Sequence, residues 1–193
     1  LSETAPAASI DPIDGETFSD TIGLPLPSTE MSIQDDKGKI LSAEKEGEIC
    51  IRGPQVMRGY WNNEIDTKNV LTKDGWFKTG DIGKMRKDGY FQIVDRKKDM
   101  IIVSGFNVYP SDIEEVAMQH QKILEAGCIG VSGKNGQELV KLFVSVVEGE
   151  TITKDEILEH CRNNLTAYKV PKLLEIVDEI PKSNVGKILR REL

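Results

Sequence analysis

The chain has 193 residues and a formal net charge of −7, with 38% hydrophobic and 30% charged residues. This length fits one large or two small domains, and the composition is ordinary for a soluble protein with a buried core. The acidic balance argues against nucleic acid as the main partner, because a phosphate-binding surface is normally basic. No apolar run reaches the ~18 residues of a membrane span, and no signal peptide is visible.

Three cysteines, Cys50, Cys128 and Cys161, lie far apart, each in an apolar pattern. They lack the close pairing of a zinc site, and the sequence adds two histidines, His120 and His160. This argues against a metal cluster. We expect the cysteines to be reduced thiols in the core of a cytosolic protein.

Residues 1–97 have a mainly β pattern. Prolines interrupt residues 1–28, which we expect to form loops. The elements predicted after them are strands at 29–34, 47–52, 76–86 and 90–94, and a short helix at 63–71 capped by Asn62 or Asn63. Lys87-Asp88-Gly89 joins the last two strands as a hairpin turn. This half is predicted to be a small distorted barrel.

Residues 98–193 mix helical and strand patterns. Ser111 is expected to cap a helix that continues to about Gln119, and Thr153 to cap a second over residues 154–165. Strands are predicted at 100–103, 123–131, 139–147 and 172–180, and a last helix at 188–193. This half is predicted to be a compact unit with helices packed on a small sheet, so the fold class of the chain is α+β.

The two patterns meet in residues 95–110, DRKKDMIIVSGFNVYP. Its four charged residues after Asp95 are typical of a solvated turn between strands. We place a domain boundary here, which gives domains at 1–97 and 98–193.

Three short motifs have polar residues suited to ligand binding, although each also has an ordinary structural explanation. TGD at 79–81 is either a capped turn at a strand start or the site of a carboxylate that accepts hydrogen bonds from a diol such as ribose. GK at 186–187 resembles a phosphate-binding turn, but it lacks the first glycine and final Ser/Thr of a P-loop, and an exposed lysine is usually just solvated. SG at 104–105 lets a ligand or another backbone approach closely, or forms a bulge.

In combination the motifs are specific. They are Ser2-Glu3, GWFKTGD at 75–81, DRKKDMIIVSG at 95–105 and PKSNVGK at 181–187. This series resembles the adenylate-forming enzymes, a superfamily of acyl-CoA synthetases, luciferases and peptide-synthetase adenylation domains. The resemblance covers the whole chain, and the segments GPQVMRGYW and VDRKKDMIIVSGFNVYPSDIEE look closest to bacterial long-chain fatty-acid–CoA ligases.

The resemblance implies a role for each matching position. Leu1-Ser2-Glu3 is similar to the end of a YGxTE motif, with Ser2 in the usual place of threonine. The implied roles are Ser2 at the α-phosphate, Glu3 at Mg²⁺, Asp81 and Arg96 at the ribose hydroxyls, Ile93 beside the nucleotide, Lys98 at the hinge, Gly105 beside the pantetheine channel, Arg162 near the phosphate end of CoA, and Lys187 as the catalytic residue. Lys187 would stabilise charge that develops as the acyl-adenylate forms. For Arg162, a solvated helix position explains the residue equally well.

The implied reaction has two steps. A fatty acid and Mg·ATP give acyl-AMP and pyrophosphate, and CoA then attacks the acyl carbon and releases AMP. Residues 1–97 would be the C-terminal β-rich part of a large domain, and residues 98–193 a mobile C-terminal domain that swings about Lys98 to bring Lys187 and Gly105 in turn. ATP or AMP, Mg²⁺ and CoA are therefore the implied ligands, and small molecules the implied partners.

The chain begins at Leu1 without methionine, so we expect a fragment. The phosphate loop and the acyl-binding residues of the family would precede Leu1, and the fragment alone is expected to be inactive. The alternatives are another acyl- or aryl-adenylating ligase, and a non-catalytic interaction module on the same scaffold. For the ligase we expect a cytoplasmic location, with room for peripheral contact with the inner face of the membrane through missing regions.

Overall fold

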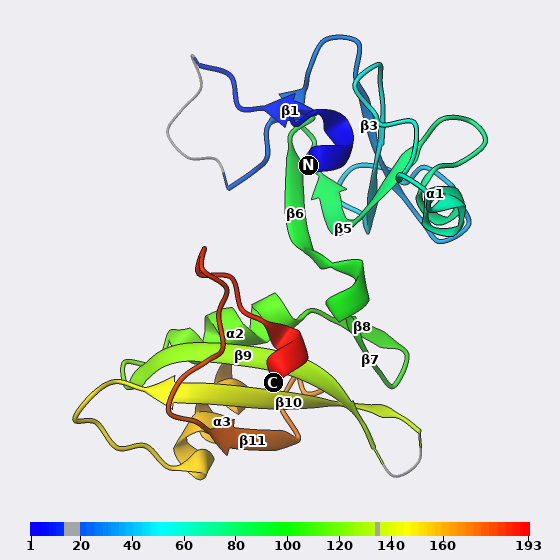
Figure 1. Cartoon of the computed structure of the whole chain (residues 1–193). Helices are drawn as coiled ribbons and strands as arrows, with labels where there is room; N and C mark the ends of the chain where they lie inside the picture. The colour runs from blue at the N-terminus through cyan, green and yellow to red at the C-terminus, as the bar shows by residue number, and fades with distance from the viewer. Residues whose placement is uncertain (14–19, 134–135) are drawn as a thin grey trace. The chain divides into compact units, whose positions relative to one another are not determined.

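The computed structural model describes residues 1–13, 20–133 and 136–193. These residues form two compact units, Leu1–Lys98 and Asp99–Leu193. Both units combine strands with helices (Figure 1), which confirms the predicted α+β class. No described helix is long and apolar enough to cross a membrane.

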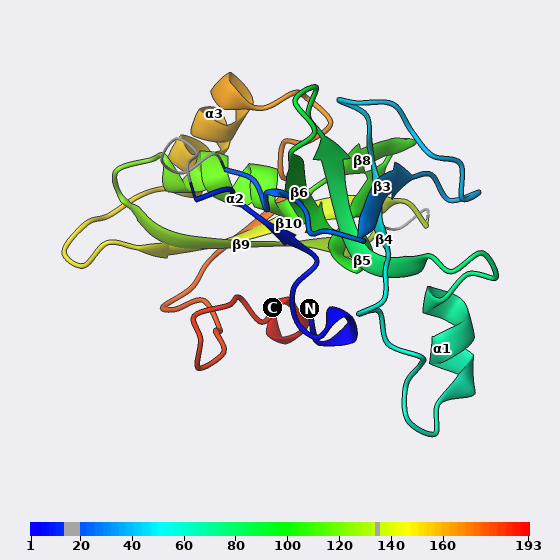
Figure 2. The same cartoon turned by 90° about the horizontal axis from the view of Figure 1, so that it is seen from above.

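The first unit is organised by an antiparallel sheet with the strand order β3-β4-β5-β6 (Figure 2). A separate ribbon pairs β1 with β2. The elements in chain order are η1 (Ser2–Thr4), β1 (Ser9–Ile10), β2 (Leu24–Pro25), β3 (Glu30–Gln34), β4 (Glu46–Arg52), α1 (Glu64–Val70), β5 (Phe77–Met85) and β6 (Phe91–Arg96). Residues 14–19, part of the predicted loop at 1–28, lie outside the described residues.

The barrel predicted for this half is not closed within the described ranges. β3 and β6 are the two edges of the main sheet, and β1 and β2 pair with each other. Small barrels close with about five to eight tilted and staggered strands, so four strands leave an open sheet. One buried hydrophobic cluster of the unit consists of Ala8, Ile33, Ile49, Ile51 and Phe91.

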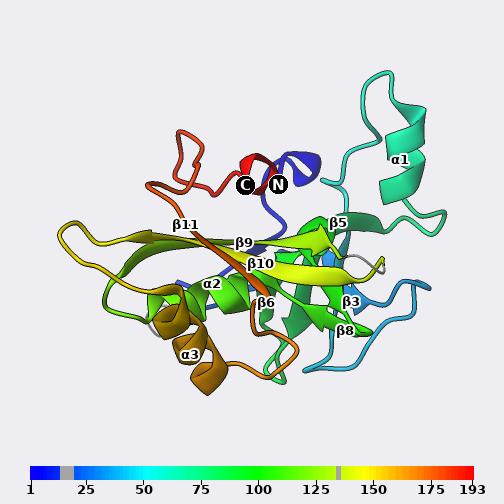
Figure 3. The same ribbon diagram turned by 90° about the horizontal axis from the view of Figure 1, so that it is seen from below.

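The second unit contains a sheet with the order β11-β10-β9 and a two-stranded hairpin, β7-β8. η2 (Lys97–Asp99) spans the boundary between the units. The elements that follow are β7 (Ile101–Val103), β8 (Phe106–Val108), α2 (Pro110–Met118), β9 (Ile123–Ser132), β10 (Glu138–Val146), α3 (Lys154–Asn164), β11 (Leu173–Ile176) and η3 (Arg190–Glu192). Figure 3 shows α2 and α3 on one side of the sheet and the C-terminal segment on the other.

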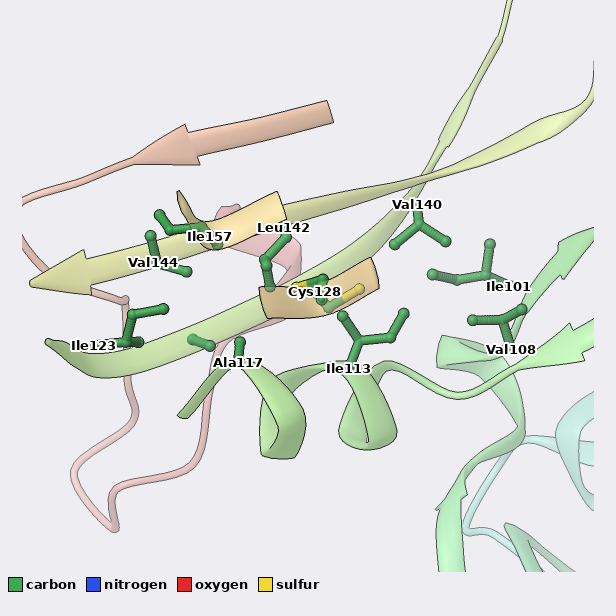
Figure 4. Close-up of a cluster of buried hydrophobic side chains, with 12 residues drawn as sticks. Ile101, Val108, Ile113, Ala117, Ile123, Cys128, Val140, Leu142, Val144 and Ile157 are labelled. Atoms are coloured by element: carbon green, nitrogen blue, oxygen red, sulfur yellow. The ribbon is translucent and has the colours of Figure 1, made fainter. Parts of the chain in front are cut away.

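The core of the second unit lies between the sheet and its two helices (Figure 4). Ile113 of α2 and Ile157 of α3 are fully buried against Leu142 and Val144 of β10. Burying an aliphatic side chain of this size stabilises a fold by roughly 1.5–3 kcal/mol. Alternate residues of β9 face the other way, where Gly127 lies beside Ile180 and Leu193 of the C-terminal segment.

Helix caps were predicted with mixed success. Thr153 and Glu156 form the reciprocal capping box of α3, which confirms Thr153 as the cap. α2 instead begins at Pro110 after Tyr109, one residue before the predicted cap Ser111. Proline favours this start because the first helical position does not need a backbone N–H.

Two elements of the last segment are shorter than predicted. The strand expected at 172–180 covers Leu173–Ile176, where four residues pair in parallel with β10. The helix expected at 188–193 is a single 3₁₀ turn, Arg190–Glu192.

Candidate functional site

The centre of the candidate site is a bulge in β5. Glu48 pairs with Ile82 and Cys50 with Lys78, so two steps along β4 match four along β5. Thr79–Asp81 lie opposite the single residue Ile49, two residues more than regular pairing, and their central glycine has a φ of +72° that other residues rarely adopt. The motif therefore lies within a strand, and the prediction of a capped turn at a strand start is wrong.

Hydrogen bonds hold this bulge in one conformation. The Thr79 hydroxyl donates to the carbonyl of Ile49 at 2.8 Å and accepts the N–H of Asp81 at 3.0 Å. The Gly80 N–H donates to Oε1 of Glu48 at 3.0 Å. As a result the backbone of Asp81 is fixed. Asp81 as a whole is 7% exposed.

Asp81 and Arg96 are cross-strand partners between β5 and β6. Nη1 of Arg96 donates to Oδ1 of Asp81, and the side chains are 38% and 11% exposed respectively. An ionised carboxylate has two oxygens with about four acceptor positions. The pair can therefore still accept hydrogen bonds from a diol at Asp81 while Arg96 offers further donors.

A pocket of about 420 Å³ lies beside Asp81. Ile93 and Asp81 line it together with Leu1 and Thr4 at the start of the chain. Its volume falls within the ~300–1,000 Å³ of typical small-molecule sites. The fold thus brings Leu1 and Thr4, which flank Ser2-Glu3, and the β5 bulge to one pocket, an arrangement that the sequence does not reveal.

A neighbouring pocket of about 390 Å³ is lined by Arg96, Lys97 and Lys98, and it shares Thr79 with the first. Lys98 is exposed. Lys97 instead pairs with Asp36 at 2.7 Å and with Glu48 at 3.0 Å. Burial lowers the pKa of Lys97, but hydrogen bonds to these two carboxylates raise it above its ordinary value overall. Lys97 is therefore held by two carboxylates of the first unit. The sequence does not predict this pairing, because Lys97 lies in a run of charged residues that are typical of a solvated turn.

Glu3 is held by a residue that sequence reasoning missed. Its carboxylate Oε1 accepts a hydrogen bond from the Tyr60 hydroxyl at 3.0 Å, and its carbonyl accepts the Met57 N–H at 2.8 Å. Burial and the contact with Glu3 raise the pKa of Tyr60. Ser2, next to Glu3, is exposed. The GYW segment gives no sequence signal for this contact.

Gly105 occupies the turn of the β7-β8 hairpin. Val103 pairs with Phe106, and the two residues between them, Ser104 and Gly105, have φ angles of 52° and 84°. Positive φ at both central positions is the signature of a type I′ turn. A bulge at this position is thus excluded, and the hairpin requires a residue that tolerates positive φ at Gly105. A Cβ added there would meet no atom within 4 Å among the described residues.

Lys187 and Arg162 are exposed in the second unit. Lys187 lies in a tight loop, where its carbonyl accepts the Ser183 N–H at 2.8 Å. Arg162 lies in the last turn of α3. Within the part of the chain that the structure describes, no three His, Cys, Asp or Glu side chains form a cluster that could hold a metal.

Comparisons with known proteins agree with these motifs. The AMP-binding enzyme family model matches residues 1–61, and the model of the AMP-binding enzyme C-terminal domain matches residues 112–187. A long-chain-fatty-acid–CoA ligase of Yersinia pestis is 54% identical over all 193 residues. The chain spans 34% of that relative's length.

Solved structures give the same result. ATP-bound MatB from Rhodopseudomonas palustris matches with a TM-score of 0.93 and 33% sequence identity. The match covers 100% of this chain and 38% of the MatB chain. O-succinylbenzoate coenzyme A synthetase (MenE) from Bacillus subtilis in complex with AMP has a TM-score of 0.85 and 30% identity, covering 100% of this chain and 39% of its own. The chain therefore belongs to the AMP-binding, adenylate-forming enzyme family, whose members bind ATP or AMP.

Proposed function

We propose that this chain is part of a long-chain fatty-acid–CoA ligase, which joins fatty acid and CoA with cleavage of ATP to AMP and pyrophosphate. The first unit would be the β-rich end of a large domain, and the second a mobile C-terminal domain. The observation that carries the proposal is the Asp81–Arg96 pair beside the 420 Å³ pocket. The 54% identity to the Yersinia pestis ligase supports fatty acids as the substrate class.

In the first unit, Asp81 would accept hydrogen bonds from the ribose hydroxyls, and Arg96 would donate to the same sugar. Ile93 is 45% exposed and lines the pocket, so it offers an apolar surface to the nucleotide. Ser2 is exposed and would donate its hydroxyl to the α-phosphate. These contacts would orient the α-phosphorus for attack by the fatty-acid carboxylate.

Glu3 would hold Mg²⁺. Its carboxylate is half-buried and supplies a hard oxygen ligand, with Oε1 oriented by Tyr60. Sites for Mg²⁺ beside nucleotides use one or two carboxylates together with phosphate oxygens and water, so a single protein carboxylate fits the ion. When bound, the ion would neutralise phosphate charge during adenylation.

In the second unit, Lys187 would place its ammonium group at the α-phosphate and carboxylate oxygens as the acyl-adenylate forms. The charge that it meets develops in the transition state, so its effect falls on the rate of that step. For the second step, Gly105 would lie beside the CoA thiol and Arg162 near the CoA phosphates. Lys98 would be the hinge between the two arrangements.

Lys187→Ala in the full-length ligase tests this assignment. We expect fatty-acid-dependent ATP–pyrophosphate exchange to fall by about a hundredfold or more, as on removal of one transition-state donor. Consumption of supplied acyl-AMP by CoA should stay within about twofold, because Lys187 acts in the first step. Equal loss of both half-reactions in a folded variant would contradict the assignment.

The acid substrate could instead belong to another class, since MenE is similar over 100% of this chain. Pyrophosphate exchange, measured with fatty acids of several lengths and with aryl acids, distinguishes the two candidate substrate classes. Exchange with aryl acids but not with fatty acids would favour the second candidate. A cytoplasmic location with peripheral contact at the inner membrane face belongs to the first proposal, because long acyl chains partition into bilayers.

A further inference from the structure

The loop that carries Lys187 is a closed hairpin. The Ser183 N–H donates to the Lys187 carbonyl at 2.8 Å, and the Leu189 N–H donates to the Pro181 carbonyl at 2.9 Å. Gly186, with a φ of +78°, allows the chain to turn between them. The hairpin is therefore internally fixed, and the place of Lys187 depends on what anchors its two ends.

The C-terminal end of this hairpin leads directly into Arg190, three positions after Lys187. The Arg190 side chain is 17% exposed. Its Nη2 donates to Oε2 of Glu114 at 2.7 Å, and its Nη1 lies 3.7 Å from Oδ2 of Asp99. The tail is thus attached to α2 and to the residue after Lys98 by a largely buried guanidinium group.

Glu114, the main partner of Arg190, is itself rigidly placed. It lies in α2 beside the core residue Ile113 and is 6% exposed. Its second oxygen, Oε1, accepts the backbone N–H of Cys128 at 2.8 Å. β9 is an edge strand of its sheet, so this carboxylate joins that edge to the helix. Arg190 is consequently bound to the core of the unit.

The other end of the hairpin follows Ile180, which is 2% exposed and lies beside Gly127 of β9, and its charged attachment is weaker than that of Arg190. Lys182 pairs with Glu125 of β9, and the two side chains are 40% and 30% exposed. Exposed ion pairs of this kind contribute little, because water and salt screen them. Arg190 is therefore the buried charged anchor of the hairpin, and Ile180 is the apolar anchor at its other end.

We propose that Arg190 is a positioning residue for Lys187. The Arg190–Glu114 pair fixes the hairpin to α2 and β9, and so presents the Lys187 ammonium group at one place on the unit. This inference rests on the proposed function of Lys187 in adenylation. Misplacing a catalytic group by about 1 Å can lower a rate by about a hundredfold.

The test uses the full-length ligase with Arg190→Met, and Arg191→Met as the matched control. Arg191 is the neighbouring arginine, and its side chain is 80% exposed. Arg190→Met should lower ATP–pyrophosphate exchange by about tenfold to a hundredfold, with CoA-dependent consumption of supplied acyl-AMP within about twofold. Arg191→Met should leave both within about twofold.

Arg190→Met also leaves the Glu114 carboxylate buried without its guanidinium partner, which is destabilising. The double variant Glu114→Gln/Arg190→Met removes both charges, and the glutamine oxygen can still accept the Cys128 N–H. We expect it to recover the thermal unfolding midpoint but not pyrophosphate exchange. Hydrogen–deuterium exchange of the Lys187 and Leu189 amides should be faster in both Arg190→Met proteins, a readout that does not depend on activity.

Three results would overturn the inference: normal pyrophosphate exchange in Arg190→Met, parallel loss of both half-reactions, or recovery of pyrophosphate exchange in the double variant. Lys187→Ala separates this failure from that of the proposed function. If Lys187→Ala abolishes exchange and Arg190→Met does not, the positioning role alone is wrong. If Lys187→Ala retains exchange, the proposed function of Lys187 is wrong.

Discussion

Asp81 and Arg96 face each other across β5 and β6, and the guanidinium group of Arg96 donates to the carboxylate of Asp81. The register of β5 and β6 places the two side chains opposite each other, so the strand pairing of the protein itself sets their geometry. Preformed polar groups lose less conformational freedom on binding than groups that must first be ordered. The binding of nucleotide should therefore depend strongly on the carboxylate.

Asp81→Asn should weaken ATP and AMP binding by about tenfold to a hundredfold, because a hydrogen bond to a charged group contributes about 1.5–3 kcal/mol. Calorimetric titration of the full-length protein measures this. Asp88→Asn is the matched control, since Asp88 forms an exposed pair with Arg86 at 2.6 Å. Equal effects of the two substitutions would remove Asp81 from the nucleotide site.

Tyr60→Phe should weaken binding of Mg·ATP by about threefold to tenfold, since it removes one hydrogen bond that orients Glu3. Binding of ATP without Mg²⁺ should change less. Titration of Mg²⁺ at fixed ATP, followed by calorimetry, checks this, and Tyr90→Phe on the β5–β6 turn serves as control. An unchanged Mg²⁺ dependence would mean that the Tyr60–Glu3 contact has no part in ion binding.

Gly105→Leu would confound two effects, since the type I′ turn requires positive φ at this position. Gly105→Asn separates them, because asparagine tolerates positive φ but adds a side chain. We expect a thermal unfolding midpoint within a few degrees of the original and slower thioesterification of supplied acyl-AMP. Normal thioesterification in Gly105→Asn would show that the glycine serves the turn alone.

The buried thiols predict an alkaline limit to stability. Burial raises the pKa of Cys50 to about 12 and that of Cys161 to about 11. In the unfolded chain both would ionise near pH ~8.5. Because the folded pKa is raised, this stability is fully present below pH ~8.5 and is lost as the pH rises toward 11–12.

Urea unfolding of this chain between pH 9 and 11 measures the effect. Cys161→Ala should reduce the slope of the unfolding free energy against pH by up to about 1.4 kcal/mol per pH unit. All three cysteines should resist alkylation at pH 8 in the native chain and react after unfolding, since each is buried. If Cys161→Ala left the slope of the unfolding free energy against pH unchanged, or if the native chain were alkylated rapidly, the raised pKa of the buried thiols would be contradicted.

Local sequence was sufficient for the regular elements. The alternation of β4, the hairpin turn between β5 and β6 and the capping box of Thr153 act within a few residues, so each is visible in the sequence. Of the β7-β8 hairpin, the first strand was predicted at 100–103, whereas β8 was missed because its three residues are too few for a periodic pattern. β11 ends earlier than its pattern because pairing with β10 stops at Ile176.

The candidate site was predictable as a list of residues but not as an arrangement. Asp81 and Arg96 appeared as separate motifs, and it is the register of β5 and β6 that makes them partners. The contact between Glu3 and Tyr60 spans 57 positions, and that between Glu114 and Arg190 spans 76. Contacts of this range are set by tertiary packing, for which a single sequence has no local signal.

The charged run around Lys98 has a mechanical consequence. Lys97 is attached to the first unit through Asp36 and Glu48, and Asp99 lies near Arg190 within the second. Lys98 lies between these two sets of ion pairs and is exposed, so the hinge proposed at Lys98 would not require either set to break.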